Sequence, residues 1–170
     1  MSSDSARTTD TAEYRRVFGH LPTGVVIVTG RGAAGEALGI TIGSFGSISL
    51  EPPLAGFFIG TSSRSWPLIA ARGTFSANVL AASQGELCWR FAKDQADGSR
   101  FDGLDVSTTP NGSPLLPGVV AAIDCTVHAE QDVGDHRLVV GAVTHLQVHD
   151  ASAVPMVFVK GKIGDAATAP

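Results

Sequence analysis

The residues best suited to ligand chemistry lie in one stretch, residues 39–53, where a short β-branched run gives way to a polar loop. The loop carries three serines, one aromatic ring and a closing Pro-Pro pair, and its only charged residue is Glu51. Glycine lets backbone amides approach a ligand closely, and hydroxyl and free N–H groups suit phosphate oxygens or a flat heterocycle. The stretch therefore predicts a ligand-binding loop rather than a plain connection.

Titratable groups elsewhere in the chain give weaker signals. His136 follows Gly134-Asp135, and from the residues alone an exposed turn histidine is the simplest interpretation. Cys88 and Cys125 lie far apart and belong to no C-x-x-C pair, so each is predicted to be a buried free thiol. The other histidines show no ligand spacing, so no metal site is predicted.

A second glycine-rich stretch, residues 30–35, matches the pattern G-x-G-x-x-G of dinucleotide-binding folds. Such a fold also needs a helix that opens at those glycines. The residues that follow are short, β-branched and interrupted by Gly39, which is typical of a strand. We therefore interpret residues 30–35 as a flexible hairpin loop.

Length and composition limit the class of protein. The 170 residues suit one domain, and a hydrophobic content of 44% is enough for a sizeable core. The net charge is −4 without a basic cluster, which argues against nucleic acid as a partner. No apolar run reaches the length of a membrane span and no signal segment opens the chain, so a cytoplasmic protein is expected. Residues 1–10 are predicted to be a disordered leader, residues 11–163 the domain, and residues 164–170 a flexible tail.

The elements that must position these residues are mostly strands. The pattern of apolar residues predicts a helix at residues 10–19 with a capping box formed by Asp10 and Glu13. Two more helices are expected at residues 65–73, capped by Ser65, and at residues 83–92, capped by Ser83. About seven strands with turn signals between them indicate a closed antiparallel barrel with few helices. The expected strands are residues 24–29, 37–42, 54–59, 74–80, 121–130, 137–148 and 156–160.

Five segments, in this order, resemble the short-chain flavin reductase family, the reductase components of two-component flavin-dependent monooxygenases. The resemblance covers roughly residues 12–163. The segments are residues 21–29, residues 39–53, residues 75–80, Phe91-Ala92 with Arg100-Phe101, and residues 134–136 with Gly141 and Val143. Two departures stand out: Ile42-Gly43 replaces the usual Ala-Asn or Ala-Ser, and residues 161–163 lack the family's closing tyrosine.

The resemblance implies an FMN-binding, antiparallel split β-barrel that forms a homodimer and holds FMN or FAD near the subunit interface. It implies an NAD(P)H:flavin oxidoreductase in which NADH or NADPH gives a hydride to the flavin and reduced flavin passes to a partner monooxygenase. No residue acts covalently. His136 is expected beside the nicotinamide. The residues expected to bind flavin are Thr41, Ser44, Phe45, Ser47, Ile48, Ser49, Ser62, Arg64, Ser65, Ser76, Ala77, Asn78 and Arg100.

Each of these roles has a structural alternative. The loop hydroxyls can instead satisfy backbone groups, and Arg64 can be a solvated arginine at a helix start. Arg100 can pair with an aspartate such as Asp102, and the strand around Asn78 can belong to the core. For the whole protein, the alternatives are a non-enzymatic flavin carrier or sensor on the same fold, or a related barrel that binds haem or pyridoxal phosphate.

Overall fold

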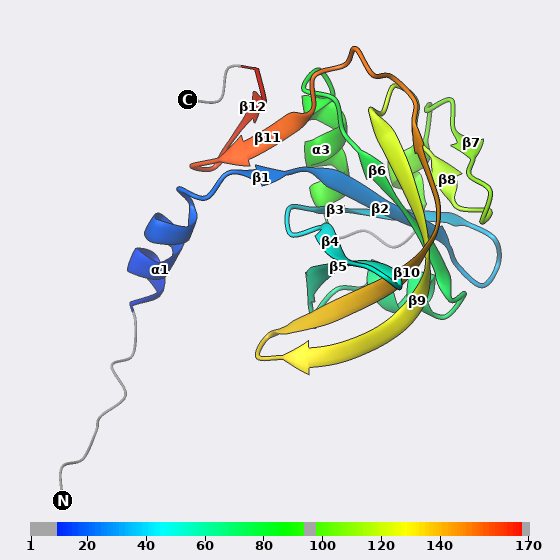
Figure 1. Ribbon diagram of the computed structural model, residues 1–170, viewed down its shortest axis with the longest axis horizontal. Helices are drawn as coiled ribbons and strands as arrows, with labels where there is room; N and C mark the ends of the chain where they lie inside the picture. Colours follow the sequence, from blue (N-terminus) through cyan, green and yellow to red (C-terminus); the bar gives the residue numbers. More distant parts are fainter. Residues whose placement is uncertain (1–9, 94–97, 168–170) are drawn as a thin grey trace, which may run out of the picture.

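The computed structural model describes residues 10–93 and 98–167, and within them β-strands predominate (Figure 1). The helices are α1 (Thr11–Phe18), α2 (Ser65–Ala70), α3 (Gly85–Ala92) and the 3-10 helix η1 (Ser99–Phe101). The strands are β1 (Thr23–Gly24), β2 (Val26–Arg31), β3 (Ala37–Ile42), β4 (Gly46–Leu50), β5 (Pro53–Gly60), β6 (Thr74–Val79), β7 (Ser107–Thr108), β8 (Pro114–Leu115), β9 (Ala121–Val133), β10 (His136–Val148), β11 (Met156–Val159) and β12 (Lys162–Asp165).

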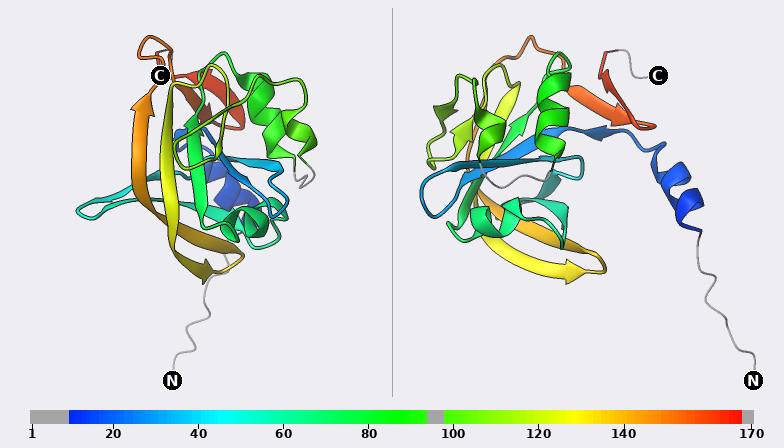
Figure 2. Two further views of the ribbon diagram at one scale, coloured as in Figure 1. Left: turned by 90° about the vertical axis from the view of Figure 1, so that its right-hand side faces the viewer. Right: turned by 180° about the vertical axis from the view of Figure 1, so that it is seen from behind.

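The main sheet has seven antiparallel strands in the order β3-β2-β6-β9-β10-β5-β4. Side chains of β3 and β5, which lie near opposite ends of that order, pack in the same hydrophobic cluster, so the sheet is curled around its core (Figure 2). β1, β11 and β12 form a separate three-stranded sheet. The predicted split barrel with few helices is confirmed.

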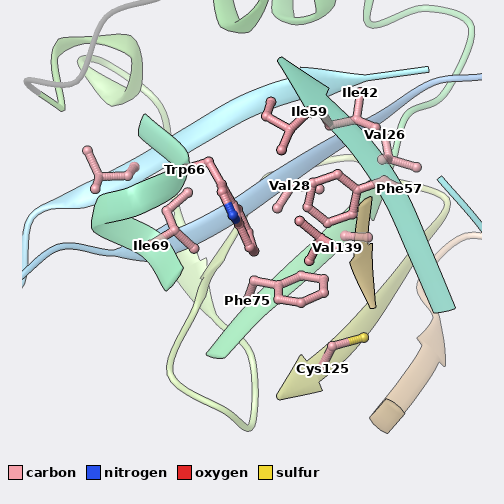
Figure 3. Close-up of a cluster of buried hydrophobic side chains, with 12 residues drawn as sticks. Val26, Val28, Ile42, Phe57, Ile59, Trp66, Ile69, Phe75, Cys125 and Val139 are labelled. Carbon is pink, nitrogen blue, oxygen red and sulfur yellow. The ribbon is translucent and has the colours of Figure 1, made fainter. Parts of the chain in front are cut away.

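The core inside the curled sheet is built on three aromatic rings, Phe57, Trp66 and Phe75 (Figure 3). They meet edge to face, with centroids 5.1 Å apart for Phe57 and Trp66 and 5.7 Å apart for the other two pairs. Each such pair contributes about 0.5–1.5 kcal/mol beyond simple burial. This cluster holds β5 in place from the inside.

A second cluster lies under α3, where Phe91 packs with Ile27, Leu80 and Met156. β3 crosses this helix at Gly39, where an added Cβ would come within 2.8 Å of the Phe91 ring. Only glycine allows β3 and α3 to approach so closely. The contact fixes the strand that leads into the ligand-binding loop.

Helix α1 projects from the body of the molecule (Figure 1). Asp10 caps it, as predicted, by accepting a hydrogen bond from the Ala12 backbone N–H at 3.1 Å. Glu13 pairs with Arg16 instead of completing the capping box. None of the helix residues is buried, and among the described residues no helix is long and apolar enough to cross a membrane.

The structure corrects several expected boundaries. β4 forms where a loop was predicted, and the predicted tail begins inside β12. The helix expected from residue 83 starts at Gly85 and has no side-chain cap from Ser83. Ser65 is not a cap either, because its buried hydroxyl accepts a hydrogen bond from Arg100. Residues 1–9 of the predicted leader lie outside the described residues.

Candidate functional site

The predicted ligand-binding loop contains an edge strand. β4 is the last strand of the main sheet, so one side of its backbone has no neighbouring strand. Its pairing with β5 shifts register between Ser47 and Ser49, which leaves Ile48 in a bulge. Unpaired edge groups and bulges both present backbone N–H groups to a ligand, and bulges are frequent beside active sites.

The hydroxyl groups of the loop fall into two sets. Thr41 donates to the Cys88 carbonyl at 2.7 Å, and Ser44 both donates to the Phe58 carbonyl and accepts from the Phe58 N–H. These two therefore fix the loop to α3 and β5. Ser47 is exposed and Ser49 half-buried, and neither side chain makes a hydrogen bond within residues 10–93 and 98–167. Their hydroxyls are the ones available to a ligand.

An apolar pocket adjoins the loop. It has a volume of about 180 Å³ and is lined by Thr41, Gly43, Val25, Trp89 and Phe158, among others. The Trp89 and Phe158 rings meet edge to face at 6.3 Å, and Trp89 is 51% exposed. The sequence did not predict this pocket, because its walls come from strands and a helix far apart in the chain.

On the other side of β5, His136 lies at the first position of β10, paired with Gly60. Ser44 contacts the same strand at Phe58, two residues earlier. With about 3.3 Å per residue along a strand and about 4.8 Å between strands, Ser44 and the histidine are about 12 Å apart. The exposed ring of Phe58 lies between them on the outer face of the sheet, because Phe57 and Ile59 point into the core.

His136 is held by its neighbour. Its Nδ1 lies 2.7 Å from the Asp135 carboxylate. This hydrogen bond, followed by the charge of the imidazole, lowers the pKa of Asp135. The turn itself is fixed by Thr61, whose N–H and hydroxyl both donate to the Asp135 carbonyl. With Nδ1 engaged, Nε2 is the ring atom left to face a ligand.

The predicted phosphate-binding residues separate in the structure. Ser62 and Arg64 are exposed in the segment that follows β5, close to the His136 turn. Ser65 and Arg100 instead point inward: Arg100 is 3% exposed and donates to the carbonyls of Phe91 and Lys93 and to the Ser65 hydroxyl. Neither the phosphate role nor the suggested Asp102 partner of Arg100 has support in these contacts. α2 has only six residues, so the helix dipole at its N-terminus contributes little to the binding of an anion.

Ser76, Ala77 and Asn78 were also expected to contact flavin, but all three are fully buried in β6. The Asn78 amide donates to the Ile27 carbonyl and the Thr29 hydroxyl, and it accepts from the Leu116 N–H. This placement gives them no surface for a ligand, so they join β6 to β2 and to the segment after β8. We leave them out of the proposed site.

Both cysteines are free and buried, as predicted. Burial, and then the charge of Asp124, raises the pKa of Cys125 to about 12, and burial raises that of Cys88. Neither thiol is a nucleophile at neutral pH. The described residues contain no group of three or more side chains that could hold a metal ion.

Comparison with known proteins identifies the family of this chain. Residues 18–167 match the family model described as a flavin reductase like domain. The chain belongs to the flavin reductase family. A flavin reductase from Pseudomonas putida is 44% identical over 151 residues, which cover 89% of this chain and 87% of that protein. The reductase subunit HsaB of a flavin-dependent monooxygenase from Rhodococcus jostii is 38% identical over 93% of this chain and 79% of its own.

Solved structures of the flavin reductase family agree with the fold. The NADH:FAD oxidoreductase SgcE6 from Streptomyces globisporus superimposes with a TM-score of 0.86, at 33% identity, over 95% of each chain. A second structure of that protein, described as a complex with NAD and FAD fragments, gives a TM-score of 0.83 at 35% identity, over 91% of this chain and 92% of that chain.

Proposed function

We propose that this chain is an NAD(P)H:flavin oxidoreductase that transfers a hydride from NADH or NADPH to FMN or FAD. The observation that carries the proposal is the position of the polar loop at Ser44 and of His136, which lie on the two sides of β5 about 12 Å apart. This spacing lets one flat ring contact the loop while a second ring lies against it beside the histidine. Relatives named flavin reductase and NADH:FAD oxidoreductase support the same activity.

The loop residues bind and polarise the flavin. When bound, a flavin supplies the ring that accepts the hydride. Reduced flavin carries extra negative charge, and backbone N–H groups around Phe45, Ser47 and Ile48 are suited to stabilise it. The hydroxyls of Ser47 and Ser49 would bond the polar chain of a bound flavin, and the exposed Ser62 and Arg64 would hold its phosphate. Orientation of two rings, rather than a covalent step, accounts for the catalysis.

His136 positions the nicotinamide. Asp135 fixes the imidazole through Nδ1, so Nε2 can bond the carboxamide group of the nucleotide. Arg137, the next residue, points to the inner side and bonds Asp132 at 2.7 Å. His136 therefore lies on the opposite face of β10 from Arg137, with its imidazole exposed.

The proposal extends to partners. Relatives that are reductase subunits of monooxygenases indicate that reduced flavin passes to a separate oxygenase. A homodimer and a cytoplasmic location complete the proposal. The homodimer is supported by the apolar face of α1, on which Tyr14, Val17 and Phe18 are each at least half exposed.

Steady-state kinetics test the activity. The purified protein should oxidise NADH or NADPH when FMN, FAD or riboflavin is supplied, with a rate that saturates in both substrates. An absorbance spectrum of the same preparation shows whether flavin is retained. Retained flavin without nucleotide oxidation would instead identify a carrier or sensor, and no affinity for any of the three flavins would reject the proposal.

The His136→Ala variant tests the nucleotide role. We expect kcat/KM for the nucleotide to fall about tenfold or more, because a hydrogen bond to the carboxamide is lost, while the Kd of flavin stays within about twofold. His128→Ala, an exposed histidine on β9, is the matched control and should behave like the parent. Equal nucleotide kinetics in the two variants would show that His136 does not contact the nicotinamide.

A further inference from the structure

A second pocket lies away from the flavin site, between the end of β2, the start of β6 and the β7–β8 turn. Its volume is about 330 Å³, within the range of small-molecule sites. Arg31 and Arg72 line it together with hydroxyl residues, and no Asp or Glu is among its described lining residues. A pocket with two guanidinium groups and no facing carboxylate attracts anions.

Two hydrogen bonds already fix the Arg31 side chain in the pocket. Its Nε donates to the Gly112 carbonyl and its Nη1 to the Gly35 carbonyl, both at 2.9 Å. A guanidinium group has five N–H donors, so three remain. Because two bonds already fix the side chain, little further conformational entropy is lost when an anion binds.

Arg72 is the second cation. It is exposed, and within residues 10–93 and 98–167 it makes no hydrogen bond or ion pair. Thr74 and Thr108 add hydroxyl groups to the lining. Arginine forks match the oxygens of phosphate with two parallel hydrogen bonds, and a second cation favours a dianion.

An orphaned hydroxyl provides an independent observation. Ser113, which also lines the pocket, is only 2% exposed, and its Oγ has no hydrogen-bond partner among the residues that the structure describes. Buried polar atoms are nearly always paired, and one that lacks a partner calls for an explanation. The turn that carries it is rigid, because the Asn111 side chain accepts from the Ser113 N–H and donates to the Phe75 carbonyl. An unpaired hydroxyl in the lining of a pocket that also contains two arginines is suited to an oxyanion.

We propose that this pocket binds a phosphomonoester dianion, held by Arg31, Arg72 and Ser113. At neutral pH such a group carries a charge of about −1.5 to −2, which matches the two arginines. The pocket volume leaves room for a small organic group beside the phosphate, such as a sugar. Inorganic phosphate shares the chemistry and is the second source to be tested.

This site is separate from the flavin site, because three strands (β9, β10 and β5) lie between β6 and β4 in the main sheet and because His136 lies at another level of the sheet. Through the strand pairs, Thr74 is level with Leu54 at the start of β5, whereas His136 pairs with Gly60 at its end. At about 3.3 Å per residue these levels are about 20 Å apart. In Figures 1 and 2 the β7–β8 hairpin and the tip of the β9–β10 hairpin lie at opposite sides of the molecule. The proposal therefore does not depend on the reductase activity.

NMR titration of the flavin-free protein at constant ionic strength tests the site. Inorganic phosphate, ribose 5-phosphate and AMP are added in turn, and the amide signals of Gly112 and Ser113 are followed. We expect saturable shifts there. Tighter binding of ribose 5-phosphate or AMP than of phosphate would identify an organic phosphoester as the ligand, and equal affinities would identify the phosphate ion.

Variants locate the binding. Arg72→Gln should weaken it about tenfold or more, whereas Arg15→Gln, an equal loss of charge on exposed α1, should leave it unchanged. Ser113→Ala should weaken it about threefold to tenfold without lowering the melting temperature, because the lost hydroxyl had no partner. Absence of saturable shifts up to tens of millimolar, or binding that Arg64→Gln abolishes and Arg72→Gln leaves intact, would overturn the proposal.

Discussion

Ser44 and Ser47 stand three residues apart and have the same side chain, yet their surroundings differ. The Ser44 hydroxyl exchanges two hydrogen bonds with the backbone of Phe58, whereas Ser47 is exposed on the edge strand. Arg64 and Arg100 differ in the same way, since Arg64 is exposed and Arg100 is buried against Ser65. A residue type alone therefore does not distinguish a ligand contact from a backbone contact.

Asn78 gives a direct test of this distinction. Asn78→Ala removes an amide that satisfies three buried groups, so we expect the free energy of unfolding to fall by about 1–3 kcal/mol. The flavin Kd of the folded protein should not change. Ser47→Ala is the converse variant, with unchanged stability and weaker flavin binding. Urea denaturation and flavin fluorescence titration measure both, and a loss of flavin affinity in Asn78→Ala at unchanged stability would return that residue to the site.

Cys125 makes stability depend on alkaline pH. Its pKa is raised to about 12 in the folded protein, while an unfolded thiol ionises near 9.0. Between these values the unfolded state loses the proton and the folded state keeps it, so stability is complete below pH 9 and falls as pH rises toward 12.

Denaturation in reducing buffer at pH 8, 9 and 10 measures this effect. Cys125→Ala lacks the thiol, so its stability should fall less steeply over the same interval, even though its stability at pH 8 is lower through lost packing. If the free energy of unfolding fell equally with pH in the variant and in the parent, the thiol would not contribute to the pH dependence.

The elements of the main sheet were largely predictable from the sequence. Alternating or β-branched runs gave β3 with its exact bounds, and β2, β5, β6, β9, β10 and β11 within a few residues. β4 was missed because glycine, serine and proline normally indicate a loop. Its strand conformation comes from pairing with β5, which is a tertiary effect.

The site was only partly predictable, because much of its geometry also depends on tertiary contacts. The polar loop stood out in the sequence, and the order of its neighbours indicated the family. The bulge at Ile48, the inward turn of Arg100 and the pocket beside Trp89 depend on which strands become neighbours. No local pattern in one sequence carries that information.

Gly141 tests the packing between β10 and the core. A Cβ at this position would lie 2.6 Å from the Phe75 ring and 2.8 Å from Cys125 Cβ. Gly141→Ala should therefore lower the free energy of unfolding by about 1–3 kcal/mol through overpacking. Gly164→Ala, where an added Cβ meets nothing within 4 Å, is the control and should leave stability nearly unchanged. Thermal unfolding compares them, and equal melting temperatures would contradict this packing.

At the scale of the whole molecule, α1 stands apart, since none of its residues is buried within the described part of the chain. It projects from the body, and Tyr14 stacks on Phe18 at 4.3 Å along an exposed apolar face that continues to Leu21. An amphipathic helix gains most of its stability from packing that face, and none of the residues of α1 is buried against the described part of this chain. The predicted homodimer would supply a packing surface for that face.

A double variant tests that assignment. Tyr14→Ser with Phe18→Ser should shift the dimer toward monomer, because the apolar face is lost, while Arg15→Ser should not. Light scattering after size-exclusion chromatography measures the mass over a range of concentrations. A parent protein that is monomeric throughout, or a double variant with unchanged dimer affinity, would show that α1 does not join two copies.

The bulge in β4 also bears on how the protein avoids aggregation through its sheet edge. A straight edge strand with unpaired N–H and C=O groups would pair with a strand of a neighbouring molecule and extend the sheet without limit. The bulge at Ile48 interrupts that regular edge after a few residues. The distortion that presents backbone N–H groups to a small planar ligand thus also makes β4 a poor template for fibrils.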